Sequence, residues 1–492
     1  MLTTLAAPAF AEIWYIEDGN ITISAGTEAG TNKVEQAGKD TVDNDKDTII
    51  TNQNKDIASS NTVTIDAGSD KVEVTLDNVN IKADSGSALT SKGDVTLTLK
   101  GDNSFTGGIS GNSSYDLSGI SSSGSLTISG GETDSLTAQG GSGGDGIYGG
   151  DGITSSGSLT ISGGTVTATG GDSTDSDGSG GSGIYSVSGD VTISGGSTVT
   201  AKGGDGNFSG GCGIYGSLTV SGGTVNATGG DGKDGYGGYG ISSNDVAISG
   251  GTVNANGGDS KDGYGGNGIS SSSGIFSFDR VAISGGKVAA TGGNGKNSNG
   301  SDGIRSSVID LSGSLELTAK AGSPNGKALS QKGSELDLDT IKDKLGPGAK
   351  VTATDADGKV IDQVPIPRPV EPEGPVIPEE SSSSSGGGSA APSAPASPLP
   401  GLTVTDKDGQ RISYTSTQSG NTLTVCVGRF TASFRISLAA LRQLRAEGIE
   451  AITFQTILCS TTLSVDELLA MGGEDAEVVL THRLTDSSLT VG

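Results

Sequence analysis

The stretch LTISGGTVTATGGD at residues 159–172 decides the fold, because close copies of it return along the chain. The copies are VTISGGSTVTAKGGD (191–205), LTVSGGTVNATGGD (218–231), VAISGGTVNANGGD (246–259) and VAISGGKVAATGGN (281–294). A glycine-rich stretch follows each copy, and Gly-Ile pairs recur every 27 to 35 residues, at Ile153, Ile184, Ile214, Ile241, Ile269 and Ile304. Self-similarity at such a period is typical of a solenoid.

Each unit contains three short segments in which apolar and polar residues alternate. In VAIS and TVNA, for example, Val246, Ile248, Val253 and Ala255 fall on one side of a strand. A strand with one apolar face cannot bury it alone, so successive units must stack. The sequence therefore predicts an all-β parallel β-helix that rises about 4.8 Å per turn. Gly-Gly pairs would supply positive φ angles and close backbone approach at its corners.

The composition excludes several classes of function. The chain has 492 residues, 86 of them Gly, and a net charge of −27. A chain this acidic is a poor partner for nucleic acid. One His and three Cys exclude a multi-histidine metal centre and a dense disulfide scaffold. Beyond the first residues, no stretch approaches the ~18 consecutive apolar residues that a membrane span needs.

Composition shifts divide the chain into four parts. Residues 1–11, which end in Ala9-Phe10-Ala11, read as the remnant of a signal peptide or as a frayed terminus. The β-helix is predicted over 12–364, with irregular early turns at 12–117, regular repeats at 118–305 and closing turns at 306–364. Trp14 and Tyr15 are expected to cap its first end. A Pro/Ser/Gly-rich linker at 365–400 leads to a small α+β domain at 401–492.

The run VTLDNVNIKADSGSALTSKGDVTLTLKGDNSFTGG (74–108), followed by the SGSLTISGGTVTATGG units, resembles a family of carbohydrate-binding surface proteins of Gram-positive bacteria. The resemblance covers roughly residues 60–360. It implies a right-handed parallel β-helix related to pectate lyases, in a family that includes binders of acidic pectin that use calcium. It also implies a secreted or cell-surface location in a Gram-positive-type bacterium.

Acidic residues gather in the loops after each Thr-Val strand. Equivalent loops on stacked turns would bring carboxylates close enough to share Ca²⁺ with backbone carbonyls. The alternative is that these side chains only keep a glycine-rich edge soluble. The candidate metal ligands are Asp172, Asp175, Asp205, Asp231, Asp234, Asp259 and Asp262.

Tyrosines recur in the same loops and are candidates for stacking against sugar rings. Gly-Ile precedes Tyr148, Tyr185 and Tyr215, and Asp-Gly precedes Tyr236 and Tyr264. The Gly-Ile series breaks at later turns, where Ser242, Ser270 and Arg305 take the position. Side chains that merely cover a bare glycine loop are the alternative.

An enzyme on this fold would need more than the repeats offer. Pectate-lyase chemistry requires a calcium cluster and a basic residue, and the repeats contain only Arg280 and Arg305. A threonine array such as Thr165, Thr167 and Thr169 resembles an ice-binding lattice, but lysine and asparagine interrupt it in the next turns. We therefore expect a protein that is not an enzyme.

The C-terminal part reads as strands around two helices, at 436–449 with Ser437 as its cap and at 464–473 with a Ser464–Glu467 capping box. Cys426 and Cys459 either form a disulfide or remain two buried thiols, and Cys212 stays free. His482 reads as a surface side chain. No catalytic signature is present, so a role in attachment, with a cell-envelope partner, is expected.

Three functions follow in order of preference. The first is an extracellular, non-enzymatic carbohydrate-binding or adhesive surface protein that binds polysaccharide or a host-cell glycan along the β-helix, with calcium as a possible aid. The second is a structural adhesin or spacer that displays the β-helix to protein partners. The third is a polysaccharide lyase that acts on pectate.

Overall fold

The computed structural model describes residues 12–109, 117–143, 148–271, 279–296, 300–364, 401–405, 411–412, 414–419, 421–427, 432–456, 460–471, 476–482 and 487–491. The chain divides into two compact units, residues 1–374 and 375–492, and each unit has its own apolar core. The predicted signal remnant and linker lie outside the described residues. No helix in the described ranges is long and apolar enough to cross a membrane.

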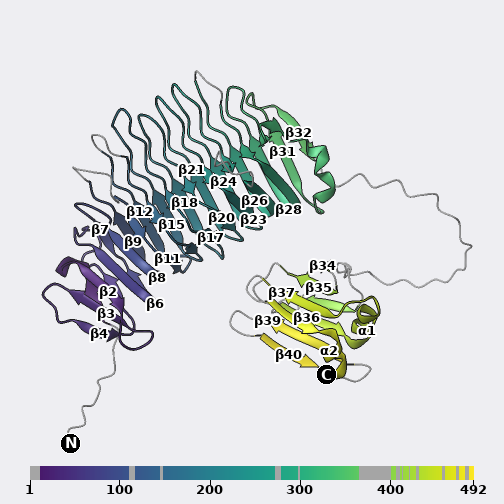
Figure 1. Cartoon of the computed structure of the whole chain (residues 1–492). Coiled ribbons are helices and arrows are strands. Elements are labelled where there is room, and N and C mark those ends of the chain that lie inside the picture. The colour runs from purple at the N-terminus through teal and green to yellow at the C-terminus, as the bar shows by residue number, and fades with distance from the viewer. Residues whose placement is uncertain are drawn as a thin grey trace, which may run out of the picture. The chain divides into compact units, whose positions relative to one another are not determined.

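The first unit is the predicted parallel β-helix, with about 11 turns in the described residues (Figure 1). Each regular turn contributes one strand to each of three faces. The first face stacks the strands that start at Gly-Ile pairs, β10 (Ile120–Ser122), β13 (Ile153–Ser155), β16 (Ile184–Ser186), β19 (Ile214–Tyr215), β22 (Ile241–Ser243), β25 (Ile269–Ser271) and β27 (Ile304–Ser306). At its two ends it also contains β2 (Ile21–Ala25) and β29 (Leu329–Gln331).

The other two faces stack in the same way. The second contains β5 (Ile49–Thr51), β11 (Ser125–Gly130), β14 (Leu159–Ile161), β17 (Val191–Ile193), β20 (Leu218–Val220) and β23 (Asp245–Ile248). The third contains β7 (Asn80–Lys82), β9 (Asp102–Thr106), β12 (Ser135–Gln139), β15 (Thr165–Thr169), β18 (Thr198–Lys202), β21 (Thr224–Thr228), β24 (Thr252–Asn256) and β31 (Lys350–Thr354). Four long strands bend to serve two faces, β6 (Val63–Asp77), β8 (Leu89–Lys100), β26 (Arg280–Thr291) and β28 (Val308–Lys320).

The apolar core is a set of columns that run through the turns. Ile161 pairs with Ile193, and Ile193 with Val220, and all three are fully buried. Apolar side chains thus meet their equivalents one rung away, which is the stacking that the alternating pattern predicts.

Glycine makes the corner between the second and third faces. Gly164 and Gly223 both adopt a φ of +74° there, a conformation that residues with a Cβ rarely take. The predicted corner role of the Ser-Gly-Gly motif is confirmed.

The first turns close the open end of the coil. Trp14, in β1 (Ile13–Tyr15), is buried and donates its indole N–H to Asp45 Oδ2 at 3.2 Å. The antiparallel strands β3 (Asn32–Gln36) and β4 (Val42–Asp45) extend from β2 and cover this end. Such covering reduces the strand edge that another chain could join at this end.

The last turns close the other end, with one departure from the prediction. Strand β32 (Val360–Val364) turns back on β31 through the predicted Asp357-Gly358 turn. In the segment 334–346 only Ser334–Glu335 forms a strand, β30. Two 3-10 helices follow it, η2 (Leu338–Thr340) and η3 (Lys342–Lys344), and a third, η1 (Ile16–Asp18), lies near the start of the chain. Leu338, Ile341 and Leu345 are buried, a helical spacing that overrides the strand-like alternation.

The second unit has two four-stranded sheets and two helices. One sheet orders β33 (Leu402–Thr405), β36 (Ala432–Ser437), β39 (Glu477–His482) and β40 (Ser487–Val491). The other orders β34 (Thr415–Ser419), β35 (Thr422–Cys426), β37 (Ala451–Gln455) and β38 (Ser460–Ser464). Both predicted helices form, α1 (Leu438–Ala446) and α2 (Val465–Met471). Strand β38 is not predicted, because its sequence has a single large apolar residue.

The prediction that His482 is a surface side chain is wrong. Its ring is buried, contacts the Phe434 ring edge-on with centroids 5.6 Å apart, and lies 3.0 Å through Nε2 from Thr461 Oγ1. Burial lowers the pKa of this imidazole. Alternation in EVVLTH puts His482 on the same face as the buried Val478 and Leu480, and that pattern signals burial. Cys459 lies outside the described residues, so the predicted disulfide is not addressed.

Candidate functional site

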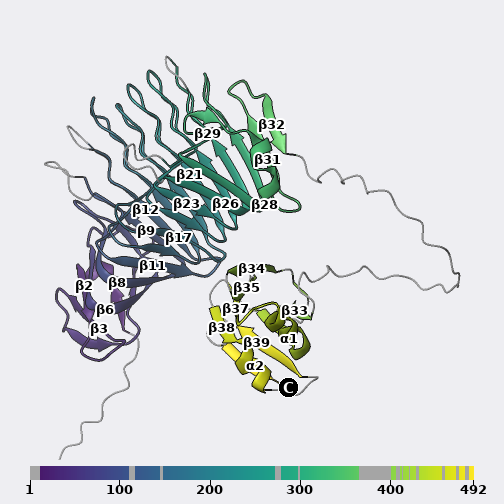
Figure 2. The same cartoon turned by 45° about the vertical axis from the view of Figure 1, so that its right-hand side comes forward.

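Between each third-face strand and the next first-face strand, the chain runs out from the coil and comes back. We call the leaving residues the outward arm, for example Gly229–Gly232, and the returning residues the return arm, for example Gly237–Gly240. Arms of successive turns extend from one edge of the coil and follow one another along it (Figures 1 and 2). Gly232 N donates to Asp259 O at 2.9 Å and Gly240 N to Asn267 O at 3.0 Å, so each arm bonds the same arm of the next turn.

A second set of hydrogen bonds joins the two kinds of arm. Gly238 N donates to Gly230 O within one turn at 2.8 Å, and Gly258 N donates to Gly238 O of the previous turn, also at 2.8 Å. The same alternation continues in the turns on either side. The arms therefore form two backbone layers bonded face to face, which we call the glycine sandwich.

Glycine is required where the layers meet. A Cβ on Gly229 would overlap the carbonyl oxygen of Gly238, and one on Gly237 would overlap the carbonyl oxygen of Gly258, in each case across the two layers. No shift of a flexible side chain relieves such an overlap, because the obstructing atoms are backbone. The unusual glycine content of the repeats is thus explained by contact between two layers of main chain.

The outward arms carry a ladder of acidic side chains, of which the sequence predicts most members. Oδ1 of Asp205 accepts the N–H of Asp231 at 2.9 Å, and Oδ1 of Asp231 accepts the N–H of Asp259 at 2.8 Å. Asp172 begins the series and Asn294 continues it. These side chains are exposed, and each extends the backbone hydrogen bonding by one contact to the next turn.

The other predicted metal ligands lie nearer the tips of the arms. Asp234 N donates to Asn207 O at 2.9 Å, and Asp262 N donates to Lys233 O at 2.8 Å. Asp175 accepts the N–H of Gly178 at its backbone carbonyl. Within the described ranges, no three His, Cys, Asp or Glu side chains gather where they would hold a metal ion.

The tyrosines form two stacked pairs on neighbouring turns. The rings of Tyr185 and Tyr215 have centroids 4.9 Å apart and an interplanar angle of 24°. The rings of Tyr236 and Tyr264 have centroids 5.8 Å apart and an angle of 16°. Tyr215, Tyr236 and Tyr264 are 41%, 53% and 46% exposed, so stacking holds these rings in place without removing them from solvent.

Tyr239, which the sequence analysis does not single out, lies near Tyr236 and Cys212. It lies three residues after Tyr236 on the return arm, in the position that Cys212 occupies one turn earlier. Burial raises the pKa of the Tyr239 phenol, with Cys212 and Tyr236 close enough to raise it further and Arg305 close enough to lower it. Burial also raises the pKa of Tyr185, and Tyr215 and Cys212 add to that effect.

We call these five residues the tyrosine strip: Tyr185 and Tyr215 on the first face, and Tyr236, Tyr239 and Tyr264 on the return arms. The GYGGYG sequence at 235–240 was the signal for its fifth member, because it places two tyrosines three residues apart at one return arm. An exposed aromatic ring that the sequence analysis also missed, Phe208, belongs to the turn before Tyr236.

Tyr148 lies apart from the strip. It is 64% exposed and precedes Gly149, whose N–H donates to Ser179 O. Its position therefore corresponds to that of Tyr236 on the return arm, three turns away. The Gly-Ile that precedes it in the sequence does not place it on the first face.

The two arginines of the repeats lie in separate places. Arg280 begins β26 and forms an ion pair with Asp310. Arg305 is an exposed first-face residue that pairs with Ser270 and Ser330 of the adjacent turns.

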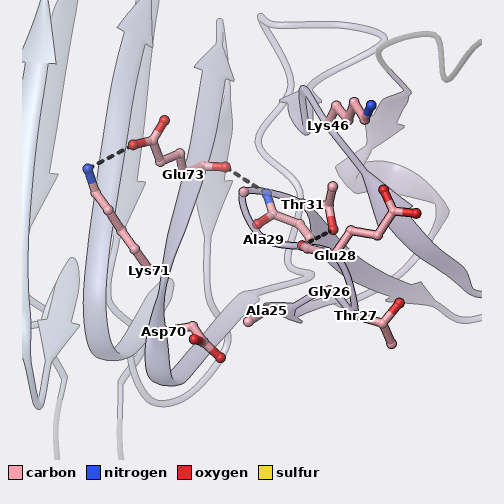
Figure 3. A pocket seen from close by; sticks show the side chains of 12 residues that line it. Ala25, Gly26, Thr27, Glu28, Ala29, Thr31, Lys46, Asp70, Lys71 and Glu73 are labelled. Atoms are coloured by element: carbon pink, nitrogen blue, oxygen red, sulfur yellow. Dashed lines mark hydrogen bonds and ion pairs between the residues drawn. The ribbon is translucent and has the colours of Figure 1, made fainter.

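A cleft of about 520 Å³ lies elsewhere, between the turn that joins β2 to β3 and the start of the second half of β6 (Figure 3). Glu28, Lys46, Asp70, Lys71 and Glu73 contribute its charges. Lys71 Nζ pairs with Glu73 Oε1 at 2.7 Å, and Asn32 Nδ2 donates to Glu73 O at 2.7 Å. No residue that the sequence singles out lines this cleft.

Comparison with known proteins agrees with the fold. A family model described as Beta helix repeat matches residues 159–183, 218–245 and 246–273. No curated protein and no solved structure matches the chain. Two of the matched segments carry a strand of every face, so the chain is a parallel β-helix repeat protein.

Proposed function

We propose that this chain is an extracellular, non-enzymatic protein that binds polysaccharide along its β-helix through the tyrosine strip. The observation that supports the proposal is the pair of ring stacks, which remain open to solvent although burial is available to aromatic side chains elsewhere in the core. Large exposed aromatic groups gathered on one surface are typical of a binding site.

The chemistry of the strip suits a sugar chain. A tyrosine combines an apolar ring with a hydroxyl that both donates and accepts hydrogen bonds, and a sugar ring likewise combines apolar C–H faces with hydroxyl groups. The strip also extends over several turns, so it matches a ligand that is itself a repeating polymer. A single compact pocket is not required.

The test is affinity electrophoresis of the full chain through gels that contain one soluble polysaccharide each. Retardation of the wild type by at least one polysaccharide supports the proposal. Replacing Tyr215 and Tyr236 together by Ser, a residue that occupies equivalent positions in neighbouring turns, should remove most of the retardation. Unchanged migration of the wild type in every gel contradicts polysaccharide binding.

Calcium assistance is a separate part of the proposal and has its own measurement. Calorimetric titration of the full chain with CaCl₂, followed by polygalacturonate with and without calcium, detects a cation-bridged site among the acidic loops. Heat that the Asp231→Asn and Asp259→Asn variants abolish would support it. The absence of heat in both titrations would leave these carboxylates as hydrogen-bond acceptors only.

A structural spacer is the second candidate, and the glycine sandwich favours it. Two layers joined by backbone hydrogen bonds make a stiff projection that needs no ligand. A pull-down in which the full chain captures a protein partner while its tyrosine variants still capture that partner would favour this function.

A further inference from the structure

The two ring stacks end abruptly, and the residues at which they end are small. On the first face, the column of outward side chains runs Thr154, Tyr185, Tyr215, Ser242 through the pairing of β13, β16, β19 and β22. On the return arm, Ser209 occupies the turn before Tyr236. A stack of two rings therefore faces a position without a ring at each of these places.

Each ring of a stacked pair gives one face to its partner and keeps the other. The outer face of Tyr215 is turned toward the turn of Ser242, and the outer face of Tyr236 toward the turn of Ser209. Turns are about 4.8 Å apart, and offset aromatic rings stack at centroid separations of about 4.5–7 Å. One more ring therefore fits beside Tyr215 above Ser242.

The surroundings of Tyr236 show what such a ring would meet at its edge. Ser209 Oγ accepts the backbone N–H of Tyr236 at 3.2 Å, which holds this hydroxyl beside the Tyr236 main chain. Ser242 is half-buried on the first face and offers a second hydroxyl. Each position thus combines one apolar ring face with a serine hydroxyl.

We propose that the positions above Ser242 and Ser209 are ring slots that take pyranose rings of an uncharged polysaccharide. This inference rests on the proposed function and names its ligand class and the place of contact. A sugar ring in a slot continues the tyrosine stack by one rung, and its hydroxyl groups contact the serine.

The charges near the strip favour an uncharged ligand over a polyanion. Asp151 lies near Tyr185 and Arg305 near Tyr239. The exposed pairs Lys233–Asp234 and Lys261–Asp262 precede Tyr236 and Tyr264, so positive and negative charges balance along the strip and give it no net attraction for acidic groups. The whole chain carries −27, which repels a polyanion at low salt.

The decisive variant is Ser242→Tyr, which fills the slot with a ring of the kind that already stands at the two previous positions of the column. The matched control is Ser242→Thr, because Thr154 occupies the same column. The full-length proteins are compared by affinity electrophoresis in hydroxyethyl cellulose, galactomannan and polygalacturonate, the last with CaCl₂ and with EDTA.

We expect the wild type to bind at least one of the two uncharged polysaccharides more tightly than polygalacturonate. Ser242→Tyr should weaken that binding by about 3- to 10-fold, the range that an aromatic stacking contact of about 0.5–1.5 kcal/mol gives. Ser242→Thr should bind as the wild type does. Tyr148→Ser removes an exposed ring outside the strip and should also leave binding unchanged.

The outcomes distinguish failure of the ring slots from failure of the proposed polysaccharide binding. If the wild type binds no polysaccharide, the proposed function fails. If it binds but Ser242→Tyr binds equally well or better, or if polygalacturonate in calcium binds more tightly, the slots are wrong while polysaccharide binding stands. Equal thermal unfolding midpoints for the wild type and Ser242→Tyr show that the variant is folded. If that variant unfolds early, Tyr215→Ser tests the same slot from its other side and should show the same loss.

Discussion

The strand faces and the glycine sandwich are two regions of the same turns that stack by different physical means. In the faces, each strand buries Ile, Val or Ala against its equivalent one rung away, as Ile193 does between Ile161 and Val220. In the sandwich there are almost no side chains between the layers, and Gly238 contacts its neighbours through N–H and C=O alone. One region tolerates a change of apolar shape, and the other tolerates no added atom.

The largest expected effect tests the packing of buried side chains in the strand faces. Ile193→Ala leaves a cavity between two buried neighbours, so the free energy of unfolding of the β-helix should fall by about 2–5 kcal/mol. Urea denaturation followed by circular dichroism measures it. Ile193→Val is the control and should cost about 0.5–1.5 kcal/mol. Equal losses for both variants would mean that the column is not closely packed.

The next largest effect tests the close backbone contacts of the glycine sandwich. Gly238→Ala places a methyl group against the Gly211 carbonyl, so the return arms of adjacent turns must separate and the stability should fall by about 1–3 kcal/mol, as in other overpacked sites. Gly196→Ala is the matched control, because a Cβ there meets nothing within 4 Å. Amide hydrogen exchange should speed up in the arms of the first variant and stay unchanged in the second. A stable Gly238→Ala protein with protected arms would contradict the sandwich.

The reactivity of the Cys212 thiol, which lies in a return arm, reports how closed the arms are without any mutation. Burial raises the pKa of the Cys212 thiol to about 11, and its sulfur accepts the Tyr239 N–H. Because only the thiolate reacts, iodoacetamide at pH 8 should alkylate Cys212 at least about 10-fold more slowly than Cys426, a difference of about 1.4 kcal/mol. In urea the two rates should converge. Similar rates in the native protein would show that the arms open readily.

The smallest effect concerns the acidic ladder. Asp231→Ala removes the acceptor of the Asp259 N–H, at a cost of about 1 kcal/mol in the free energy of unfolding. Asp231→Asn keeps an acceptor oxygen, as Asn294 does for the Ser323 N–H, and should cost nothing. Thermal unfolding of both variants checks this. A larger loss for Asn than for Ala would show that the charge itself holds the ladder together.

The strand faces were predictable from sequence and the sandwich was not, for a physical reason. Burial selects residue types, so the alternation in Val246 to Ser249 records which side chains face the core. Hydrogen bonds between main chains select only the absence of a Cβ, so Gly230 and Gly238 show that something approaches closely without showing what it is. The sequence therefore indicates corners and close contacts, and the partner layer has to be seen.

The candidate site likewise contains residues that the repeat predicts and residues that it does not. Tyr185 and Tyr215 stand at equal positions of a repeat, so their contact could be predicted from the repeat alone. Tyr239 occupies a position that holds Cys212 or Asn267 in the neighbouring turns, so no column of tyrosines points to it. For His482 the sequence did carry a signal. Its alternation with Val478 and Leu480 indicates burial, whereas its polar side chain led to the prediction of a surface position.

Because successive turns pair in register, changes in the gene can add or remove whole turns of the coil. Residues 241–268 form one complete turn, because β22 starts at Ile241 and β25 at Ile269. Unequal recombination between the DNA segments that encode successive turns would add or delete such a unit, and the flanking strands would still meet partners in register. Each event changes the length of the coil by about 4.8 Å and places new side chains in every column. We expect natural variants to differ by whole turns, and thus by the number of rungs on which tyrosines can stand.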